Sequence, residues 1–187
     1  MIDQASTYAA EIDNIIIWVA ILAGFWFFVA EGAFFWLILR YRAKPGVKAQ
    51  YLEGHETHVK KWVTWPHFFI LGFDLVIIWM AISVWYNVKQ QLPEPDRTIR
   101  VIGQQWAWTF QHPGQDNQLD TDDDIFTVDE LHVEVDQTYH FLLEARDVLH
   151  AFSIPVFRIK QDAIPGRTIT GWFEATQTGE YDVQCAE

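Results

Sequence analysis

Two residues in the C-terminal half of the chain could bind a transition metal together. His150 lies in Asp147-Val-Leu-His-Ala-Phe152, and Cys185 lies in Gln184-Cys-Ala-Glu187. An imidazole and a thiolate suit copper, because soft sulfur and borderline nitrogen favour copper over Mg²⁺ or Ca²⁺. The structural alternative stays open, since a single histidine in a strand is commonly structural and a single cysteine commonly packs as a small apolar side chain.

The segment from Gln115 to Asp124 is a second candidate site, because it contains five aspartates. A calcium-binding loop would have Gly at its sixth position and Glu at its twelfth, and the segment has neither. A solvated loop and a docking surface for a basic partner protein are both compatible with this pattern.

The 187 residues divide into two halves of different character. Residues 1–90 are neutral in total, so the whole net charge of −12 belongs to residues 91–187. An acidic surface repels phosphate, which argues against nucleic acid as a partner. Aromatic residues make up 16% of the chain, and this density excludes a disordered protein.

Two apolar runs, at about 15–39 and about 66–88, predict transmembrane helices. At about 1.5 Å per residue, each run can cross a hydrocarbon core of about 30 Å. Thr64 is a candidate N-cap for the second helix, with Pro66 in its first turn. Basic residues concentrate in the connection 40–65, so the positive-inside rule places this connection in the cytoplasm and both termini outside.

Each apolar run contains one acidic residue, Glu31 in the first and Asp74 in the second. Acidic side chains within a membrane are costly and face protein or water. Hydrogen bonding within the hairpin or between subunits is one interpretation of both residues. A role in proton uptake is the other.

Residues 91–97 contain two prolines and form a linker, which separates a membrane part (1–90) from a soluble domain (98–187). Alternating apolar and polar residues in the soluble domain predict short strands. The predicted strands are Thr98–Ile102, Leu131–Asp136, Thr138–Leu143, Thr168–Phe173 and Tyr181–Cys185. Short strands separated by turns predict an all-β sandwich or a Greek-key barrel.

Four segments together resemble subunit II of the haem–copper cytochrome c oxidases. Asp147-Val-Leu-His150 resembles the family's D-V-x-H segment, and Lys160-Gln-Asp-Ala-Ile-Pro-Gly-Arg167 resembles its K-x-D-A-I-P-G-R segment. Gly103-Gln-Gln-Trp-Ala-Trp108 is similar to the aromatic G-H-Q-W-Y-W segment. Gly179 to Glu187 is similar to the opening of the segment that carries both copper-bridging cysteines. The resemblance implies a two-helix transmembrane hairpin followed by an all-β, cupredoxin-like sandwich.

The resemblance also implies roles for single residues. His150 would bind one copper of the binuclear copper centre called CuA, and Cys185 would bridge both coppers as a thiolate. Glu187 would give its backbone carbonyl to copper and its carboxylate to a Mg²⁺ shared with subunit I. Asp147 belongs to the histidine segment, and Asp162 would lie near the interface with subunit I.

Trp106 would be the point at which electrons arrive from a diffusing or attached cytochrome c. Core packing is the alternative, because Trp106 and Trp108 share a face if their segment is a strand. The implied partners are oxidase subunit I, subunit III, cytochrome c and the lipid bilayer, with the haems in the partner subunit only. The expected location is a bacterial plasma (inner) membrane, with the soluble domain outside the cytoplasm.

The family continues past the position of Glu187 with a second Cys, a second His and a Met. We therefore expect these residues to belong to a longer polypeptide that completes the copper loop and the last strand. Two other functions stay open, a copper-free quinol oxidase subunit II and a structural membrane-anchored subunit. The presence of both His150 and Cys185 argues against the quinol oxidase branch.

Overall fold

A computed structural model describes residues 2–49 and 51–187, so position 50 of the expected connection 40–65 lies outside the described residues. The described chain forms two compact units. One unit is Asn14–Ser83, which contains most of both long helices. The other combines the residues up to Asp13 with Val84–Glu187, and we call it the β-domain.

The two long helices are α1 (Ala9–Arg40) and α2 (Thr57–Trp85), and both are long and apolar enough to cross a membrane. Helix α2 begins nine residues before the expected start at Pro66. The prediction that Thr64 caps the helix is wrong, because its Oγ1 donates within the helix to the carbonyl of Lys60 at 2.9 Å. The apolar run marked the part of the helix suited to lipid, whereas lysines and other polar residues also favour helix and extend it.

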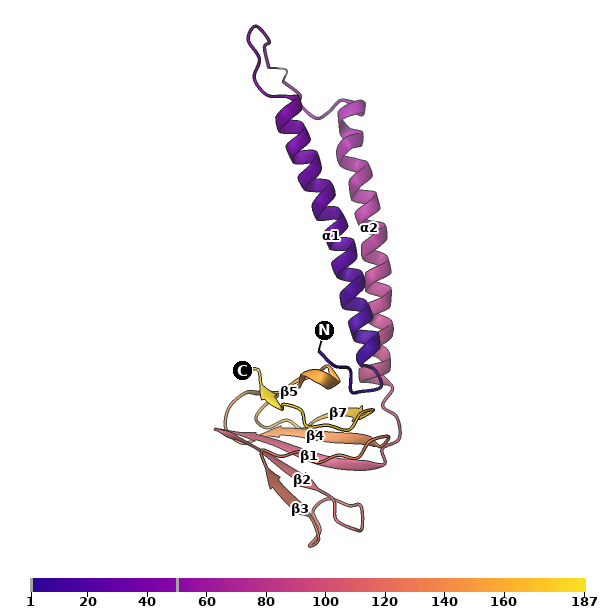
Figure 1. Ribbon diagram of the computed structural model, residues 1–187, viewed down its shortest axis with the longest axis vertical. Helices are drawn as coiled ribbons and strands as arrows, with labels where there is room; N and C mark the ends of the chain where they lie inside the picture. Colours follow the sequence, from indigo (N-terminus) through magenta and orange to yellow (C-terminus); the bar gives the residue numbers. More distant parts are fainter. Residues whose placement is uncertain (1, 50) are drawn as a thin grey trace. The chain divides into compact units, whose positions relative to one another are not determined.

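A single-turn π-helix, η1 (Tyr86–Gln90), precedes the strands of the β-domain. Five strands form one sheet in the order β3-β2-β1-β4-β7 (Figure 1). Three strands form a second sheet in the order β6-β5-β8. The first sheet contains β1 (Arg97–Gln104), β2 (Ala107–His112), β3 (Ile125–Val128), β4 (Thr138–Ala145) and β7 (Ile169–Glu174). The second contains β5 (His150–Ile154), β6 (Ile159–Ala163) and β8 (Gln184–Cys185), and a 3₁₀ turn, η2 (Pro155–Phe157), follows β5.

The two sheets pack face to face around aromatic side chains. Phe152 of β5 lies with its ring centroid 5.7 Å from Phe141 of β4 and 6.3 Å from Phe110 of β2. All three side chains are fully buried. The predicted fold class, two long apolar helices followed by a β-sandwich, is therefore confirmed.

Some strand predictions are wrong. The segment Leu131–Asp136 alternates as a strand would, yet only Val135 makes an isolated bridge, to Ala175. Asp129, two residues before the segment, and Asp136, its last residue, adopt left-handed φ angles of 60° and 59°, which interrupt the extended chain at both places. Strand β5 was not predicted, because every one of its residues is buried and the sequence therefore shows no alternation.

The N-terminal segment is part of the β-domain. Ala5, Tyr8 and Ala9 are buried with the strand residues. The Ala5 N–H donates to the carbonyl of Val156 at 3.0 Å, and the Tyr8 hydroxyl donates to the carbonyl of Trp172 at 3.0 Å. The start of the chain thus lines the core of the sandwich.

Arg158 fixes this segment in place. Its Nε and Nη2 atoms donate to the two carboxylate oxygens of Asp13, both at 2.7 Å. The remaining donors reach the carbonyls of Ile2, Asp3 and Pro155. The Arg158 and Asp13 side chains are only 12% and 7% exposed, so each buried charge depends on the other.

Replacement of Arg158 by Ala would leave the Asp13 carboxylate buried without its partner. We expect the β-domain to lose about 3 kcal/mol or more of unfolding free energy, as for other broken buried ion pairs. Urea unfolding of the full chain in detergent, followed by near-UV circular dichroism, measures this loss. Arg167→Ala, at an exposed arginine of the same domain, is the control, and an equal loss in both variants would contradict the prediction.

Candidate metal centre

His150 and Cys185 are brought together by the second sheet. Strands β5 and β8 are antiparallel neighbours, with Phe152 opposite Cys185. The Ala186 N–H continues this pairing by donating to the carbonyl of Ala151 at 3.1 Å. As a result, the Cys185 Sγ lies 4.0 Å from the His150 Nδ1. The predicted pair of metal-binding residues is therefore adjacent in the fold, although 35 positions separate the two in sequence.

Asp147 determines which ring nitrogen of His150 is available. Its Oδ1 lies 2.7 Å from the His150 Nε2, so Nδ1 is the nitrogen that faces the sulfur. The carboxylate also accepts hydrogen bonds from the backbone N–H groups of Gln105 and Val148, both at 2.7 Å. The contact with His150 and these two backbone donors lower the pKa of Asp147 to about 2. A carboxylate on the far nitrogen is the arrangement that orients histidine ligands of metals.

The Cys185 sulfur lies close to a backbone oxygen. Its Sγ is 3.2 Å from the carbonyl oxygen of Glu187. Partial burial would raise the pKa of the thiol, but hydrogen bonds with the backbone at Ala151 and Glu187 and with the His150 ring outweigh burial and lower it. The net shift favours the thiolate, which is the form that binds metals.

Packing holds the imidazole of His150 from behind. The residue is 8% exposed, and its ring meets the ring of Trp108 edge to face at 5.8 Å. Gly103 lies against the same two rings, because a Cβ at this position would be 3.0 Å from both. The sequence offered Gly103 and Trp108 only as members of the aromatic segment, and their role in supporting His150 was missed.

Trp106 is exposed beside this pair. The residue lies in the turn between β1 and β2 and is 91% exposed, whereas Trp108 is 8% exposed. The core-packing alternative for Trp106 is therefore wrong, because the turn ends the two-residue alternation that would give both tryptophans one face. A cavity of about 390 Å³ is lined by this turn, by Val148 and Leu149, and by His150, Cys185 and Glu187.

The donors present fit copper in type. They comprise one imidazole nitrogen, one sulfur and one backbone carbonyl. Within residues 2–49 and 51–187, the structure places no cluster of three His, Cys, Asp or Glu side chains around a common metal position.

Asp162 is exposed on β6 and pairs with Ala151, the residue after His150. Glu31 and Asp74 belong to the other unit, Asn14–Ser83, and a role for either in proton uptake stays a prediction.

The aspartate-rich segment Gln115–Asp124, which we call the acidic loop, is held by side chains of the β-domain. Arg100 donates to both carboxylate oxygens of Asp120, at 2.7 and 2.9 Å. The Gln111 amide donates to Asp120 at 3.1 Å and to Asp124 at 2.5 Å. Part of the negative charge of the acidic loop is therefore paired with Arg100 of the same domain. Docking of a basic partner on this loop stays a prediction.

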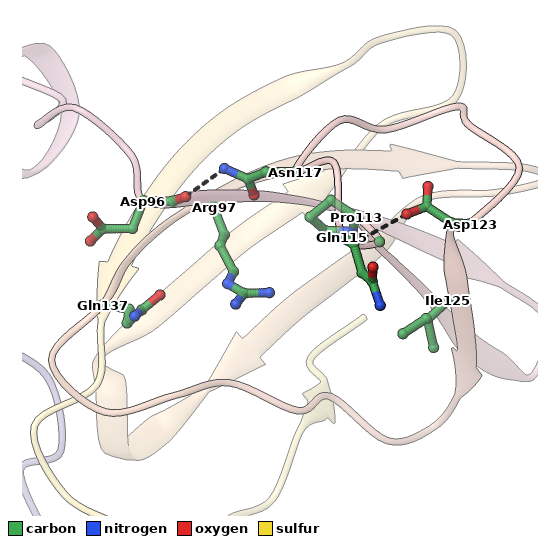
Figure 2. A pocket seen from close by; sticks show the side chains of 9 residues that line it. Asp96, Arg97, Pro113, Gln115, Asn117, Asp123, Ile125 and Gln137 are labelled. Atoms are coloured by element: carbon green, nitrogen blue, oxygen red, sulfur yellow. Dashed lines mark hydrogen bonds between the residues drawn. The ribbon is translucent and has the colours of Figure 1, made fainter.

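A larger cavity, of about 850 Å³, lies between this loop and the start of β1 (Figure 2). Figure 2 shows Asn117 donating to the carbonyl of Asp96 and the Gln115 N–H donating to Asp123. The Asp96 carboxylate accepts the N–H of Thr138 at 2.8 Å. Both carboxylates are thus engaged by their own chain, and we assign no ligand to this cavity.

The fold and the site together define a class, a β-sandwich domain that follows two potential membrane helices and carries a histidine–cysteine pair suited to copper. Residues 97–187 match the family described as "Cytochrome C oxidase subunit II, periplasmic domain". Through this cupredoxin-like domain the chain belongs to the cytochrome c oxidase subunit II family.

Individual relatives agree with this membership. "Alternative cytochrome c oxidase subunit 2" of Bradyrhizobium diazoefficiens is 28% identical over 205 residues, which cover 96% of this chain and 70% of the relative. "Cytochrome c oxidase subunit 2" of Thermostichus vulcanus is 44% identical over 93 residues, or 50% of this chain and 25% of that protein. The matched residues thus cover 70% of the length of the first relative but only 25% of the second.

A solved structure is also similar. The periplasmic domain of subunit II of cytochrome oxidase (CoxB) of Bradyrhizobium japonicum has a TM-score of 0.44 and 32% sequence identity. The match covers 52% of this chain and 76% of that one.

Replacement of Gly103 by Ala would push a methyl group against the rings of His150 and Trp108. We expect a loss of about 1–3 kcal/mol of unfolding free energy, the usual cost of overpacking. Thermal unfolding of the full chain in detergent measures the effect. Gly24→Ala is the control, because a Cβ there meets no atom within 4 Å, and a Gly103→Ala variant as stable as this control would contradict the prediction.

Acid should weaken the contacts of Asp120. Hydrogen bonds from Arg100 and Gln111 lower the pKa of this carboxyl from its ordinary 3.8 to about 2, so the ionised form stabilises the fold. This contribution is complete above about pH 4 and is lost as the pH falls towards 2. The difference in melting temperature between the wild type and Asp120→Asn should therefore shrink over that range. Asp122→Asn, at an exposed aspartate of the same loop, is the control, and a difference that stays constant with pH would refute the prediction.

Proposed function

We propose that this chain is the electron-accepting subunit of a haem–copper terminal oxidase. It takes electrons from cytochrome c at a binuclear copper centre and passes them to haem in subunit I, where O₂ is reduced. The observation that carries the proposal is the 4.0 Å approach of the Cys185 Sγ to the His150 Nδ1 in a domain that matches the subunit II family.

Three residues of this chain would hold copper. His150 offers Nδ1, Cys185 offers its thiolate and Glu187 offers its backbone carbonyl. Bound copper would supply the one-electron redox chemistry. Asp147 keeps the imidazole in the right tautomer and orientation, since its oxygen engages the opposite ring nitrogen. The Glu187 carboxylate would bind a Mg²⁺ shared with subunit I.

The surface near the site suits a protein electron donor. Trp106 is 91% exposed, and the adjacent Val148 and Leu149 are also exposed, so an aromatic and apolar patch lies beside the metal-binding pair. Electrons would arrive through Trp106. The net charge of −12 would attract a basic cytochrome, an effect that falls as the salt concentration rises.

The packing of the N-terminal segment supports the proposed orientation in the membrane. The residues up to Asp13 and the strands share one compact unit, so the start of α1 and the end of α2 are expected on the same side of a bilayer. The basic connection between the helices then lies in the cytoplasm. We place the β-domain outside the cytoplasm, on a bacterial plasma membrane, with Asp162 near subunit I and subunit III as a further partner.

The copper content of the purified oxidase complex tests this function. We expect copper bound to the subunit in the wild type, and a more than about tenfold loss in His150→Ala and Cys185→Ser, because each removes a ligand. Cytochrome c oxidation should fall in parallel. His132→Ala is the control, since the side chain of this histidine in the same domain is 71% exposed.

Two outcomes would contradict the proposal. One is a wild-type complex without subunit-bound copper, and the other is full copper content in both ligand variants. The intact mass of the subunit, compared with 21.9 kDa for these residues, reports whether further ligands can come from the same polypeptide.

A further inference from the structure

Strand β3 leaves one edge of the five-stranded sheet open. It pairs only with β2, and no further strand of the described residues lies beyond it (Figure 1). At the opposite edge, beside the end of β7, the N-terminal segment partly covers the sheet. There the Thr7 N–H donates to the Glu174 carbonyl at 3.3 Å. The Thr176 N–H donates to the Ala5 carbonyl at 2.9 Å. The chain thus protects one edge of the sheet and presents the other.

Backbone groups of β3 point toward the open edge. In an antiparallel pair, successive residues of one strand direct their N–H and C=O groups alternately toward the neighbouring strand and away from it. The Asp129 N–H donates to the Trp108 carbonyl of β2 at 2.8 Å. The alternation therefore directs the groups of Thr127 toward β2 and those of Phe126 and Val128 outward. An extended chain beside β3 can form hydrogen bonds with these outward groups.

Large apolar side chains accompany these backbone groups. Ile125, Phe126 and Val128 are 58%, 61% and 59% exposed. Phe126 and Val128 lie on one face of the strand and Ile125 on the other, because side chains alternate along a strand. The strand itself contains no proline and no charged residue, so it lacks two of the features by which proteins prevent pairing at an edge. Its composition favours pairing with a further strand.

Acidic residues lie at both ends of β3. Asp122 and Asp123 precede the strand, and Asp129 and Glu130 follow it. All four side chains are exposed. Within the part of the chain that the structure describes, none of them forms an ion pair with lysine or arginine. A strand that pairs with β3 therefore meets negative charge at both of its ends, and basic residues there complement this charge.

We propose that β3 is the docking site for an extended, basic segment of a partner protein, which adds a strand to the sheet at its open edge. The segment places apolar side chains beside Phe126 and Val128 and carries lysine or arginine at both ends. Backbone hydrogen bonds provide affinity, and the flanking charges select the partner. This inference does not rest on the copper centre or on the proposed function.

A second copy of this chain fits the open edge poorly. Antiparallel pairing of two β3 strands about a two-fold axis would place Asp122 and Asp123 of one copy beside Asp129 and Glu130 of the other. Like charges opposed on paired strands are destabilising. A basic segment of a different protein avoids this repulsion.

Peptide binding to the purified oxidase complex tests the chemistry of the edge. The probe is a fluorescent peptide of alternating valine and threonine with two lysines at each end, followed by fluorescence anisotropy. We expect binding that weakens as the salt concentration rises. A matched peptide with glutamate in place of lysine should bind at least about tenfold more weakly. Equal binding of the two peptides, or no binding of the lysine peptide, would overturn the proposal.

The substitution Val128→Pro tests whether the peptide binds at β3. Proline is tolerated in an edge strand where the lost N–H faces solvent, so near-UV circular dichroism should show an intact domain. Binding of the lysine peptide should weaken by about tenfold or more, because one donor is lost and the ring obstructs pairing. Val128→Thr is the matched control, since it keeps the N–H and the branched shape. Unchanged peptide binding in Val128→Pro would contradict the proposal.

A change in the probe gives the same information without a variant of the protein. The lysine peptide N-methylated at every valine and threonine cannot donate hydrogen bonds to the edge and should bind at least about tenfold more weakly. If it binds as well as the unmodified peptide, only charge attracts the probe and the docking site is wrong. This comparison decides the matter even if Val128→Pro fails to fold.

Photo-crosslinking in intact membranes identifies the native occupant. A benzoylphenylalanine at position 126 should crosslink to a basic segment of another protein, mapped by mass spectrometry. The same probe at position 167 is the control, because the exposed Arg167 precedes β7 at the opposite edge of the sheet and should not reach that segment. Crosslinks from position 126 only to another copy of this chain, or to no protein, would overturn the proposal. None of these readouts depends on copper, so the proposed function and the docking site can fail separately.

Discussion

The ion pair between Arg158 and Asp13 joins residues 145 positions apart, and much of the β-domain depends on it. Arg158 follows the 3₁₀ turn η2, which in turn follows β5, the strand that carries His150. The same arginine binds carbonyls of the N-terminal segment, whose Ala5 and Tyr8 are buried in the core. Because the pair is almost fully buried, neither charge can be left alone without a large cost in stability. The start of the chain is therefore a structural part of the sandwich.

The candidate metal centre also depends on one carboxylate that makes several contacts. The Asp147 carboxylate binds both the His150 ring and the backbone N–H of Gln105, so it joins this histidine to the turn that carries Trp106. Trp108 and Gly103 support the ring from behind. An imidazole held on several sides needs little movement when the charge of a bound metal changes, which suits electron transfer.

The sequence predicted the parts of the fold that depend on local pattern. The two apolar helices and the strands around Thr98–Ile102, Thr138–Leu143 and Thr168–Phe173 are present, because length, apolar content and alternation are properties of neighbouring residues. The alternating segment Leu131–Asp136 is not a strand, since a strand also needs a neighbour with which to form hydrogen bonds. Strand β5 escaped prediction because burial on both faces removes the alternation.

By itself, the sequence determined the division into an apolar half and an acidic half, the family to which the chain belongs, and the candidate ligands His150 and Cys185. Only the tertiary structure decided that these two side chains meet at 4.0 Å and that Trp106 is exposed while Trp108 is buried. The physical reason is that residue type and spacing are properties of the sequence itself. Proximity, burial and the direction of a side chain depend instead on segments that only folding brings together.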